Sequence, residues 1–264
     1  MLMLLVTLIA IPLYGASGVE AAPPDLSAKR AALINADTGE LIYGKNEHER
    51  ASMATTKIMT SLLALESGKQ NDVVTASEQA VRVEGTSIGL RAGDQITLKT
   101  LVCGMLLESG NDAANVTAEY LAGSNDAFAA MMNERAAEIG MLDTHFVTPS
   151  GLDDEEHYSS AYDMALLGAC AIQNHAFVQI CSARSMRVSY GTPEAARTFT
   201  NHNRMLSDYE GAIGIKTGFT KKSGRCLVTA ARRNGITLVA VTLNDPDDWR
   251  DHAALLDYGF EQVH

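Results

Sequence analysis

Apolar and polar residues alternate with a strand period at both ends of the chain. The stretch "RAALINADTGELIYGKN" (residues 30–46) predicts two strands joined at the hairpin turn Asp37-Thr38-Gly39. The stretch "RCLVTAARRNGITLVAVTLN" (225–244) predicts two more strands around Asn234-Gly235, a strong turn signal. A further strand, "GIKTGFT" (214–220), leads into this second hairpin. These patterns indicate a mainly antiparallel sheet.

The middle of the chain instead repeats with the period of a helix. Helices are predicted over 57–68, 97–123 with a break at Ser109-Gly110-Asn111, 125–140, 161–174 and 247–260. Residues 69–95 have mixed loop and short-strand character, and residues 145–160 form a loop. Strands at both ends and helices between them predict an α+β fold in which helices flank an antiparallel sheet.

Composition sets the size and the class of the protein. The 264 residues are 46% hydrophobic and 20% charged, which is enough for one large domain with a buried core. The formal net charge of -11 argues against nucleic-acid binding, which usually requires a basic face. The four cysteines, Cys103, Cys170, Cys181 and Cys226, are too scattered for a disulfide scaffold, so buried free thiols are expected. No spacing of cysteine and histidine predicts a metal site.

The first residues, "MLMLLVTLIAIPLYG", form an apolar run of the size of a signal-peptide core. Val19 and Ala21 suit a cleavage site, so we expect a signal peptide at 1–22 and one domain at 23–264. No Lys or Arg precedes the run, because the first is Lys29, and an uncleaved N-terminal anchor is the second interpretation. Both interpretations predict export from the cytoplasm, with membrane association in the second.

The helix over 57–68 raises the first question of chemistry. It is apolar round most of its circumference, which predicts a buried helix, and Lys57 stands at its start. A lone helix lysine is ordinarily a solvated head group, but burial would lower its pKa and let the neutral amine accept a proton. Ala54 lies one helical turn earlier, where a nucleophilic hydroxyl would belong. Ser52, Thr55 and Thr56 have the wrong spacing to replace it.

Two further stretches carry candidate chemistry. Ser109 and Asn111 offer a hydroxyl and an amide at a helix break, where the ordinary role is local capping. Lys216 and Thr217 lie on a predicted strand, where a lysine commonly protects an edge. As functional residues they would supply a fixed positive charge and a donor to a substrate carboxylate. Gly218 would allow a peptide backbone to approach the strand closely.

The order and the flanks of these stretches resemble a known family. The serine penicillin-binding proteins and β-lactamases carry S-x-x-K, S-D-N and K-T-G elements. This chain has "MATTKIMTSLLALE", "LLESGNDAANVTAEYL", "THFVTPSGL", "HYSSAYDMALL" and "GIKTGFTKKSGRCLV". It is most similar to the low-molecular-weight D-alanyl-D-alanine carboxypeptidases, over roughly residues 28–260. The resemblance implies a transpeptidase-like fold with a helical lobe, and no C-terminal β domain is expected within residues 23–264.

The resemblance also implies roles for residues. The family's serine, at the position of Ala54, attacks the bond between two D-alanines and forms an acyl-enzyme that water clears. Lys57 would be the general base, Ser109 would relay a proton, and Asn111 would hold the substrate amide. Lys216 and Thr217 would take the carboxylate, while the backbone N–H groups of Ala54 and Phe219 would form the oxyanion hole. The implied partners are peptidoglycan stem peptides and inhibitory β-lactams, with no cofactor or metal.

Ala54 leaves two explanations open. It is either an engineered change in an otherwise competent hydrolase of cell-wall metabolism, or the mark of a natural stem-peptide-binding protein that does not catalyse. The intact neighbouring residues favour the first. A class A β-lactamase is a weaker alternative, because no E-x-x-L-N glutamate is found. The acidic run Asp153-Asp154-Glu155-Glu156 is predicted to be a solvated loop.

Overall fold

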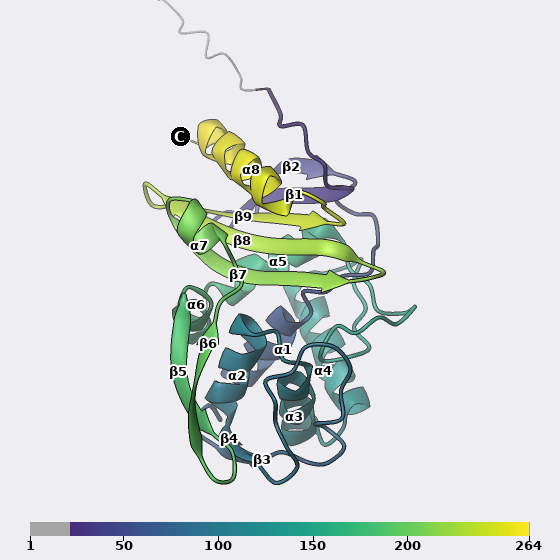
Figure 1. The fold of residues 1–264 in the computed structure, drawn as a ribbon. Coiled ribbons are helices and arrows are strands. Elements are labelled where there is room, and N and C mark those ends of the chain that lie inside the picture. Colours follow the sequence, from purple (N-terminus) through teal and green to yellow (C-terminus); the bar gives the residue numbers. More distant parts are fainter. Residues whose placement is uncertain (1–21, 264) are drawn as a thin grey trace, which may run out of the picture.

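A computed structural model describes residues 22–263, and its centre is a five-stranded antiparallel sheet (Figure 1). The strand order is β2-β1-β9-β8-β7, so strands from the two ends of the chain pair with each other. The strands are β1 (Arg30–Asn35), β2 (Leu41–Lys45), β7 (Ala212–Thr220), β8 (Gly224–Arg233) and β9 (Ile236–Leu243). Both predicted hairpins and the strand before the second one are therefore confirmed.

Helices cover both faces of the sheet (Figure 1). On one face lies α8 (Asp248–Gln262), and on the other lies α5 (Ala161–Ala171), beyond which a helical lobe extends. The lobe and its edges contain α1 (Lys57–Glu66), α2 (Leu98–Leu107), α3 (Asn111–Ala122), α4 (Asn125–Ile139), α6 (His175–Cys181), the ribbons β3 (Val73–Thr75)–β4 (Gln95–Thr97) and β5 (Ser185–Tyr190)–β6 (Ala195–Thr200), and the short α7 (Met205–Asp208) beside β7. The predicted α+β architecture is confirmed.

The alternation of side chains along the central strands builds two hydrophobic cores. On β9, Val239 and Val241 belong to the larger core, which the sheet shares with the helical lobe. Leu238 and Ala240 point the other way, into the smaller core beneath α8. Because successive strand residues face opposite sides of a sheet, a strand covered on both faces must be apolar throughout. This explains the unbroken apolar run "LVAV" at residues 238–241.

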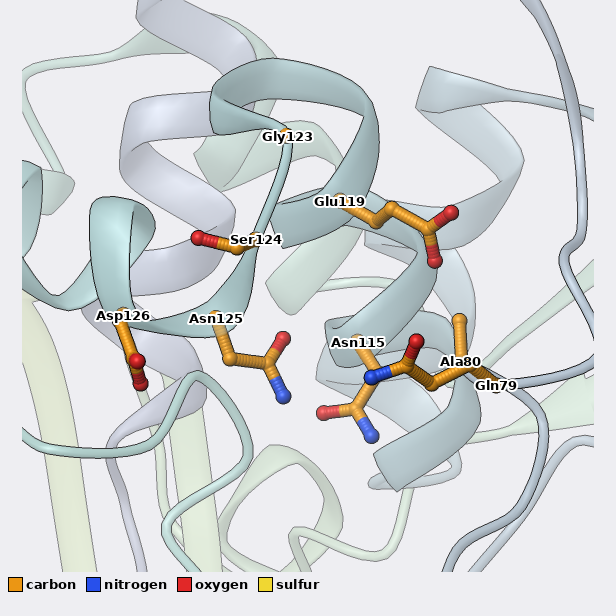
Figure 2. A pocket seen from close by; sticks show the side chains of 8 residues that line it. All are labelled: Gln79, Ala80, Asn115, Glu119, Gly123, Ser124, Asn125 and Asp126. Atoms are coloured by element: carbon orange, nitrogen blue, oxygen red, sulfur yellow. The ribbon is translucent and has the colours of Figure 1, made fainter.

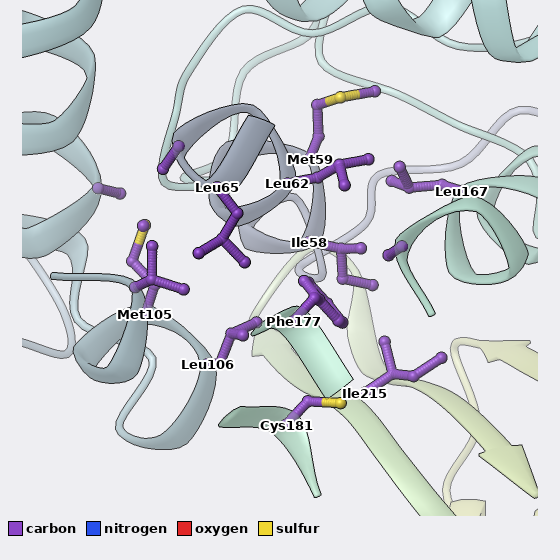
Figure 3. Close-up of a cluster of buried hydrophobic side chains, with 14 of the residues drawn as sticks. Ile58, Met59, Leu62, Leu65, Met105, Leu106, Leu167, Phe177, Cys181 and Ile215 are labelled. Carbon is purple, nitrogen blue, oxygen red and sulfur yellow. The ribbon is translucent and has the colours of Figure 1, made fainter. Parts of the chain in front are cut away.

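The larger core encloses α1 (Figure 3). Its side chains Ile58, Met59, Leu62 and Leu65 pack among Met105 and Leu106 of α2, Leu167 of α5, Phe177 and Cys181 of α6, and Ile215 of β7. Every residue of α1 except Leu63 and Glu66 is buried, as the sequence predicts. The first turn of α1 is thereby fixed between the lobe and the sheet.

Several elements were not predicted. The ribbon β5–β6 exposes most of its side chains and buries only Tyr190 and Phe199, so its apolar signal is weak. Helix α6 has seven residues and α7 has four, which is too short for a helical period to stand out. The free thiols of Cys103, Cys181 and Cys226 are buried as expected, but Cys170 is partly exposed beside Arg135.

The expected signal peptide at 1–22 lies outside the described residues except for Ala22, and the domain limits stay a prediction. Between residues 22 and 263, no single helix has the length and apolar character of a membrane span. Helices α5 and α6 reach that length only as a pair, and they are bent by 108° at the break between them. Both helices contribute side chains to the larger core.

Candidate active site

The start of α1 places Lys57 inside the protein. Ala54 lies in the bend that precedes the helix, and Lys57 is its first residue. Only 3% of Lys57 is exposed, and its Nζ donates a hydrogen bond of 2.6 Å to the carbonyl oxygen of Ser150. Ser150 belongs to the "TPSGL" loop, more than ninety residues further along the chain. The amine is therefore held by a backbone group rather than by a carboxylate.

Burial lowers the pKa of Lys57 well below its usual value. Loss of water is the largest cause, because it penalises the charged form, and the positive charge of Lys216 adds to it. The carboxylate of Asp112 opposes the shift. The site therefore favours a neutral amine at Lys57, the form that can accept a proton from a nucleophile.

The break between α2 and α3 presents Ser109 and Asn111. Ser109 has a φ of +61°, a left-handed conformation that a residue with a side chain seldom adopts. Asn111 begins α3 and is buried. Its backbone N–H donates to Thr86 O at 2.8 Å and its Nδ2 donates to Glu84 O at 2.7 Å. The side chain of Asn111 thus ties this break to the loop over residues 84–90.

Asp112 fixes the same loop, although the sequence analysis did not single it out. Its buried carboxylate accepts hydrogen bonds from Ser87 Oγ (2.6 Å), Ile88 N (3.0 Å) and Leu90 N (3.0 Å). A carboxylate with three such donors is well satisfied despite its burial. The "SGND" motif therefore supplies Ser109 to the pocket, while Asn111 and Asp112 hold the loop over residues 84–90.

Lys216 lies on β7, at the edge of the sheet that faces α1. It is 2% exposed, and its Nζ donates to Thr217 O at 2.6 Å. Burial lowers the pKa of Lys216 to about 8. At neutral pH it is thus still mostly protonated, which makes it a positive charge beneath the strand edge.

Gly218 is required by a close approach of Ala54. A Cβ added to Gly218 would lie 2.5 Å from Ala54 O and 2.9 Å from Ala54 Cβ. A Cβ atom essentially never approaches another heavy atom so closely, so any larger residue would push β7 away from the start of α1. From the sequence we expected this space to admit a substrate backbone. In the structure, the protein's own backbone at position 54 already fills it.

Residues of the second and third motifs line one pocket of about 340 Å³. Its lining includes four predicted site residues together with five others: Ser109, Thr217, Gly218 and Phe219, then Thr86, His202, Arg225, Asp248 and Trp249. Ala54 touches the wall of this pocket through Gly218. Lys216 lies close enough for its positive charge to lower the pKa of Lys57. Of the predicted catalytic residues only Ser109 lines the pocket, and Lys57, Asn111 and Lys216 are buried beside it. The convergence of Ala54, Ser109 and Lys216 on one cleft stays a prediction.

Arg225 and Asp248 form the far wall of the pocket and were not predicted. The guanidinium of Arg225 donates two hydrogen bonds to Asp248, at 3.0 and 2.8 Å, and lies 5.6 Å from the centre of the Trp249 ring. Arg225 follows the K-T-G element closely in sequence, but its partners belong to α8. Only the fold brings them together.

Asp153 also has a partner that the sequence did not reveal. Its Oδ1 accepts from Ser52 Oγ at 3.2 Å and from Thr220 Oγ1 at 2.8 Å. This carboxylate therefore links the segment before Ala54 to the end of β7. Asp153 is exposed in a loop, as predicted for the acidic run, and in addition it accepts hydrogen bonds from two hydroxyls of distant segments.

A second pocket, of about 360 Å³, lies on the helical lobe (Figure 2). It is lined by Gln79, Ala80, Asn115, Glu119, Gly123, Ser124, Asn125 and Asp126. None of the motif residues reaches it, and Asn115 and Glu119 are the exposed side of α3. Across residues 22–263, no group of three His, Cys, Asp or Glu side chains could hold a metal ion.

Comparison with known proteins identifies the family. A family model described as D-alanyl-D-alanine carboxypeptidase, peptidase family S11, matches residues 17–247. The chain belongs to this family. It is 36% identical to the D-alanyl-D-alanine carboxypeptidase DacF of Bacillus subtilis over 89% of the chain and 62% of DacF. It is 33% identical to DacB2 of Mycobacterium tuberculosis over 90% of the chain and 84% of DacB2. The chain thus spans less than two thirds of DacF and most of DacB2.

Solved structures of this family have the same fold. A D-alanyl-D-alanine carboxypeptidase from Mycobacterium tuberculosis superposes with a TM-score of 0.86 at 32% identity, covering 92% of this chain and 94% of that one. The Streptomyces K15 DD-transpeptidase also gives 0.86, at 28% identity, covering 91% and 99%. The transpeptidase-like fold implied by the sequence motifs is confirmed.

Proposed function

We propose that this chain binds peptidoglycan stem peptides ending in D-Ala-D-Ala, in the site of a serine D-alanyl-D-alanine carboxypeptidase. The observation that carries the proposal is the buried Lys57 amine beside position 54, opposite the β7 edge with Lys216. Both amines are buried, while Ser109, Thr217, Gly218 and Phe219 line the pocket beside Ala54, so a proton acceptor and a carboxylate partner would lie next to a bound peptide. β-Lactams would occupy the same pocket as inhibitors.

Substrate binding uses the edge strand and the charge beneath it. An extended peptide adds to an exposed strand through backbone hydrogen bonds, and β7 is such an edge. The carboxylate at the end of the peptide is attracted by Lys216 and accepts a hydrogen bond from Thr217. Asn111 holds the peptide's amide. These contacts need no nucleophile, so the protein with Ala54 keeps them.

Catalysis requires a hydroxyl at position 54. A serine there would give its proton to neutral Lys57 while its Oγ attacks the carbonyl carbon of the penultimate D-alanine. Backbone N–H groups of residues 54 and 219 would stabilise the oxyanion. Through Ser109 the proton would pass to the nitrogen of the leaving D-alanine, and the C–N bond would break. Water would then hydrolyse the ester and restore the hydroxyl.

With Ala54 the reaction cannot begin, because a methyl group cannot attack a carbonyl. The chain as printed is therefore a binding protein for the substrate of its relatives. A natural role in binding without catalysis is the second candidate function, and Ala54 is the observation that favours it. We further propose that the protein acts outside the cytoplasm, on the basis of the apolar run at residues 1–15 and the location of the proposed substrate.

The test is to restore the hydroxyl. The Ala54→Ser variant should react covalently with labelled penicillin and release D-alanine from a D-Ala-D-Ala peptide, and Ala54→Ser with Lys57→Ala should do neither. Loss of a nucleophile typically lowers turnover on the order of a million-fold. A folded Ala54→Ser protein without either activity would favour the non-catalytic candidate.

Calorimetry with the printed chain separates binding from catalysis. The Ala54 protein should bind the D-Ala-D-Ala peptide, and Lys216→Ala should weaken this binding. If the Ala54 protein binds no peptide, and Ala54→Ser does not react with penicillin, the proposed function is wrong in both forms.

A further inference from the structure

A buried histidine outside the three motifs contacts the start of α1. His157 lies in the loop between α4 and α5 and is 2% exposed. Its Nδ1 accepts hydrogen bonds from the backbone N–H groups of Val147 (3.0 Å) and Thr148 (3.3 Å). A nitrogen that accepts from two N–H groups cannot carry a proton itself. The neutral ring therefore has its hydrogen on Nε2.

The protonated Nε2 points at the residue before Lys57. It lies 2.7 Å from Thr56 Oγ1, which must be the acceptor because Nε2 carries the hydrogen. The hydroxyl hydrogen of Thr56 is then free to donate to Met53 Sδ, at 3.2 Å. Thr56 and Met53 stand on either side of Ala54 and Thr55. One imidazole thus connects the 147–148 backbone to the turn that presents position 54.

The loop over residues 149–151 lies against the same turn. Thr60 Oγ1 donates to Pro149 O at 2.6 Å, and Lys57 Nζ donates to Ser150 O at 2.6 Å. A Cβ on Gly151 would lie 2.6 Å from Thr56 Oγ1, so the loop and the residue before the helix are in close contact at this point. His157 bonds to residues 147 and 148, which directly precede this segment, and to Thr56, against which Gly151 packs.

We propose that His157 is a positioning residue that holds residues 147–151 against the first turn of α1, so that the Ser150 carbonyl fixes and dries the Lys57 amine. That His157 positions a catalytic base rests on the proposed function. That His157 holds the loop, and thereby lowers the pKa of Lys57, does not depend on it. Without His157, the two N–H groups of residues 147 and 148 would lose their acceptor, and the loop would separate from the helix.

This connection requires a neutral ring. A proton on Nδ1 would face two N–H donors, which would repel it. Burial lowers the pKa of His157 to about 4, with opposing effects from the nearby groups: Asp154 and Asp153 raise it, while His145 and Lys222 lower it further. The loop should therefore stay docked at neutral pH and loosen in acid.

The deciding experiment is a titration of Lys57 by NMR in the Ala54 protein, with its signal assigned by the Lys57→Arg variant. In His157→Ala, water should reach the amine, and the midpoint of Lys57 should rise by about one pH unit or more, because burial is the main cause of its lowered pKa. His145→Ala is the matched control, since the half-buried His145 lies in the same loop and the only hydrogen bond of its ring is to Glu156 O, while its backbone pairing with Tyr158 is kept by alanine. It should leave the midpoint unchanged.

Two more variants keep the test decisive. His157→Gln retains an acceptor and a donor but cannot be protonated, so it should keep the midpoint of Lys57 low. Thr56→Val removes the oxygen that accepts from Nε2 and donates to Met53 Sδ, and it should raise the midpoint even if His157→Ala fails to fold. An unchanged midpoint in both Thr56→Val and a folded His157→Ala would overturn the proposal.

An activity measurement then separates this proposal from the proposed function. In the Ala54→Ser background, His157→Ala should move the acid limb of the penicillin acylation rate to higher pH, with little change in KM for the peptide. If Ala54→Ser is inactive, the proposed function fails, while the titration of Lys57 still decides the role of His157.

Discussion

At the scale of single residues, two lysines without carboxylate partners dominate the energetics of the site. The pKa of Lys216 falls from 10.5 to about 8 because the side chain is buried. One pKa unit corresponds to about 1.4 kcal/mol, so burying this charge costs about 3 kcal/mol at neutral pH. The cost is fully present below pH 8, and it disappears as pH rises from 8 towards 10.5. The buried charge of Lys216 therefore lowers the stability of the protein, but it can attract a substrate carboxylate.

A change of Lys216 to Met should make the protein more stable and weaken its binding of the substrate. We expect the free energy of unfolding at pH 7 to rise by about 2 kcal/mol, because the desolvation cost is removed while the hydrogen bond to Thr217 O is lost. Binding of a D-Ala-D-Ala peptide should be lost at the same time. Urea unfolding and calorimetry give the two quantities. Lys222→Met, an exposed lysine of the same hairpin, should alter neither. A less stable Lys216→Met protein would contradict the assigned cost.

The sequence could predict which side chains enter the site but not what holds them. Lys57, Asn111 and Lys216 stand in recognisable motifs, and all three are buried. Their partners are the backbone carbonyls of Ser150, Glu84 and Thr217, and a carbonyl leaves no trace in residue identity. His157 is visible only as the first letter of "HYSS", because its two backbone donors and its threonine acceptor come from other segments.

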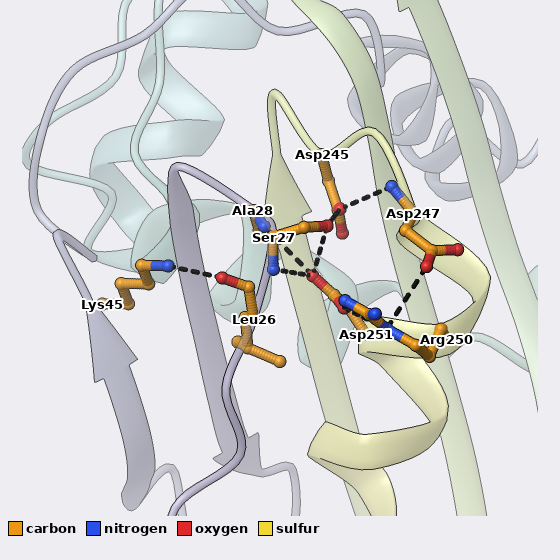
Figure 4. A network of polar contacts seen from close by, with 8 residues as sticks. All are labelled: Leu26, Ser27, Ala28, Lys45, Asp245, Asp247, Arg250 and Asp251. Atoms are coloured by element: carbon orange, nitrogen blue, oxygen red, sulfur yellow. Dashed lines mark hydrogen bonds and ion pairs between the residues drawn. The ribbon is translucent and has the colours of Figure 1, made fainter.

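At the scale of elements, the start of β1 is attached to α8 by one carboxylate (Figure 4). Asp251 is fully buried, and its Oδ2 accepts from Ser27 N (2.6 Å), Ala28 N (3.0 Å) and Ser27 Oγ (2.9 Å). Ser27 Oγ also lies 2.8 Å from Asp245 Oδ1. Burial raises the pKa of Asp251, but hydrogen bonds from Arg250 and from the backbone outweigh it, and the pKa is lowered overall.

Removing this carboxylate should loosen the edge of the sheet. Asp251→Ala leaves the N–H groups of residues 27 and 28 without an acceptor, and we expect the free energy of unfolding to fall by about 3 kcal/mol. Trypsin should then cleave at Lys29 and Arg30 in the native protein. Asp247→Ala is the matched control, because Asp247 also pairs with Arg250 but is exposed. Equal losses of stability in the two variants would contradict the assignment.

Element prediction succeeded where the periodic signal was long and bounded by turn residues. The hairpin at Asn234-Gly235 and the helix that ends before Gly140 both follow the sequence closely. The ribbon β5–β6 was missed because it lies against the lobe with few buried side chains. Its position depends on tertiary contacts such as Tyr190 Oη with Ile88 O, at 2.5 Å, which local sequence does not encode.

At the scale of the whole molecule, the two hydrophobic cores each enclose one neutral histidine. His157 lies in the lobe beside α1, and His252 lies on α8 with its Nε2 3.1 Å from Thr242 Oγ1. Burial lowers the pKa of His157 to about 4 and that of His252 to about 3. Both histidines take up a proton on unfolding at any pH between these values and 6.5. Acid therefore favours the unfolded chain on both sides of the sheet.

The sign and the size of this effect can be measured. A histidine whose pKa is lowered by folding stabilises the protein fully above pH 6.5, and the contribution is lost as pH falls towards the folded pKa. Near pH 5 each of the two should add about 1.4 kcal/mol per pH unit to the dependence of unfolding free energy on pH. We expect His252→Gln to reduce the slope between pH 4.5 and 5.5 by this amount, whatever it does to stability at pH 7, because glutamine takes up no proton.

Urea unfolding at several pH values gives the slopes directly. His175→Gln serves as the control, since His175 is exposed at the start of α6 and should leave the slope unchanged. Adding His157→Gln to His252→Gln should remove a second, equal increment, because the two rings lie in different cores and titrate independently. If the slope of His252→Gln matches that of the parent protein, the His252 ring must already be protonated or solvated in the folded state. The helix α8 would then close the smaller core less tightly than its packing indicates.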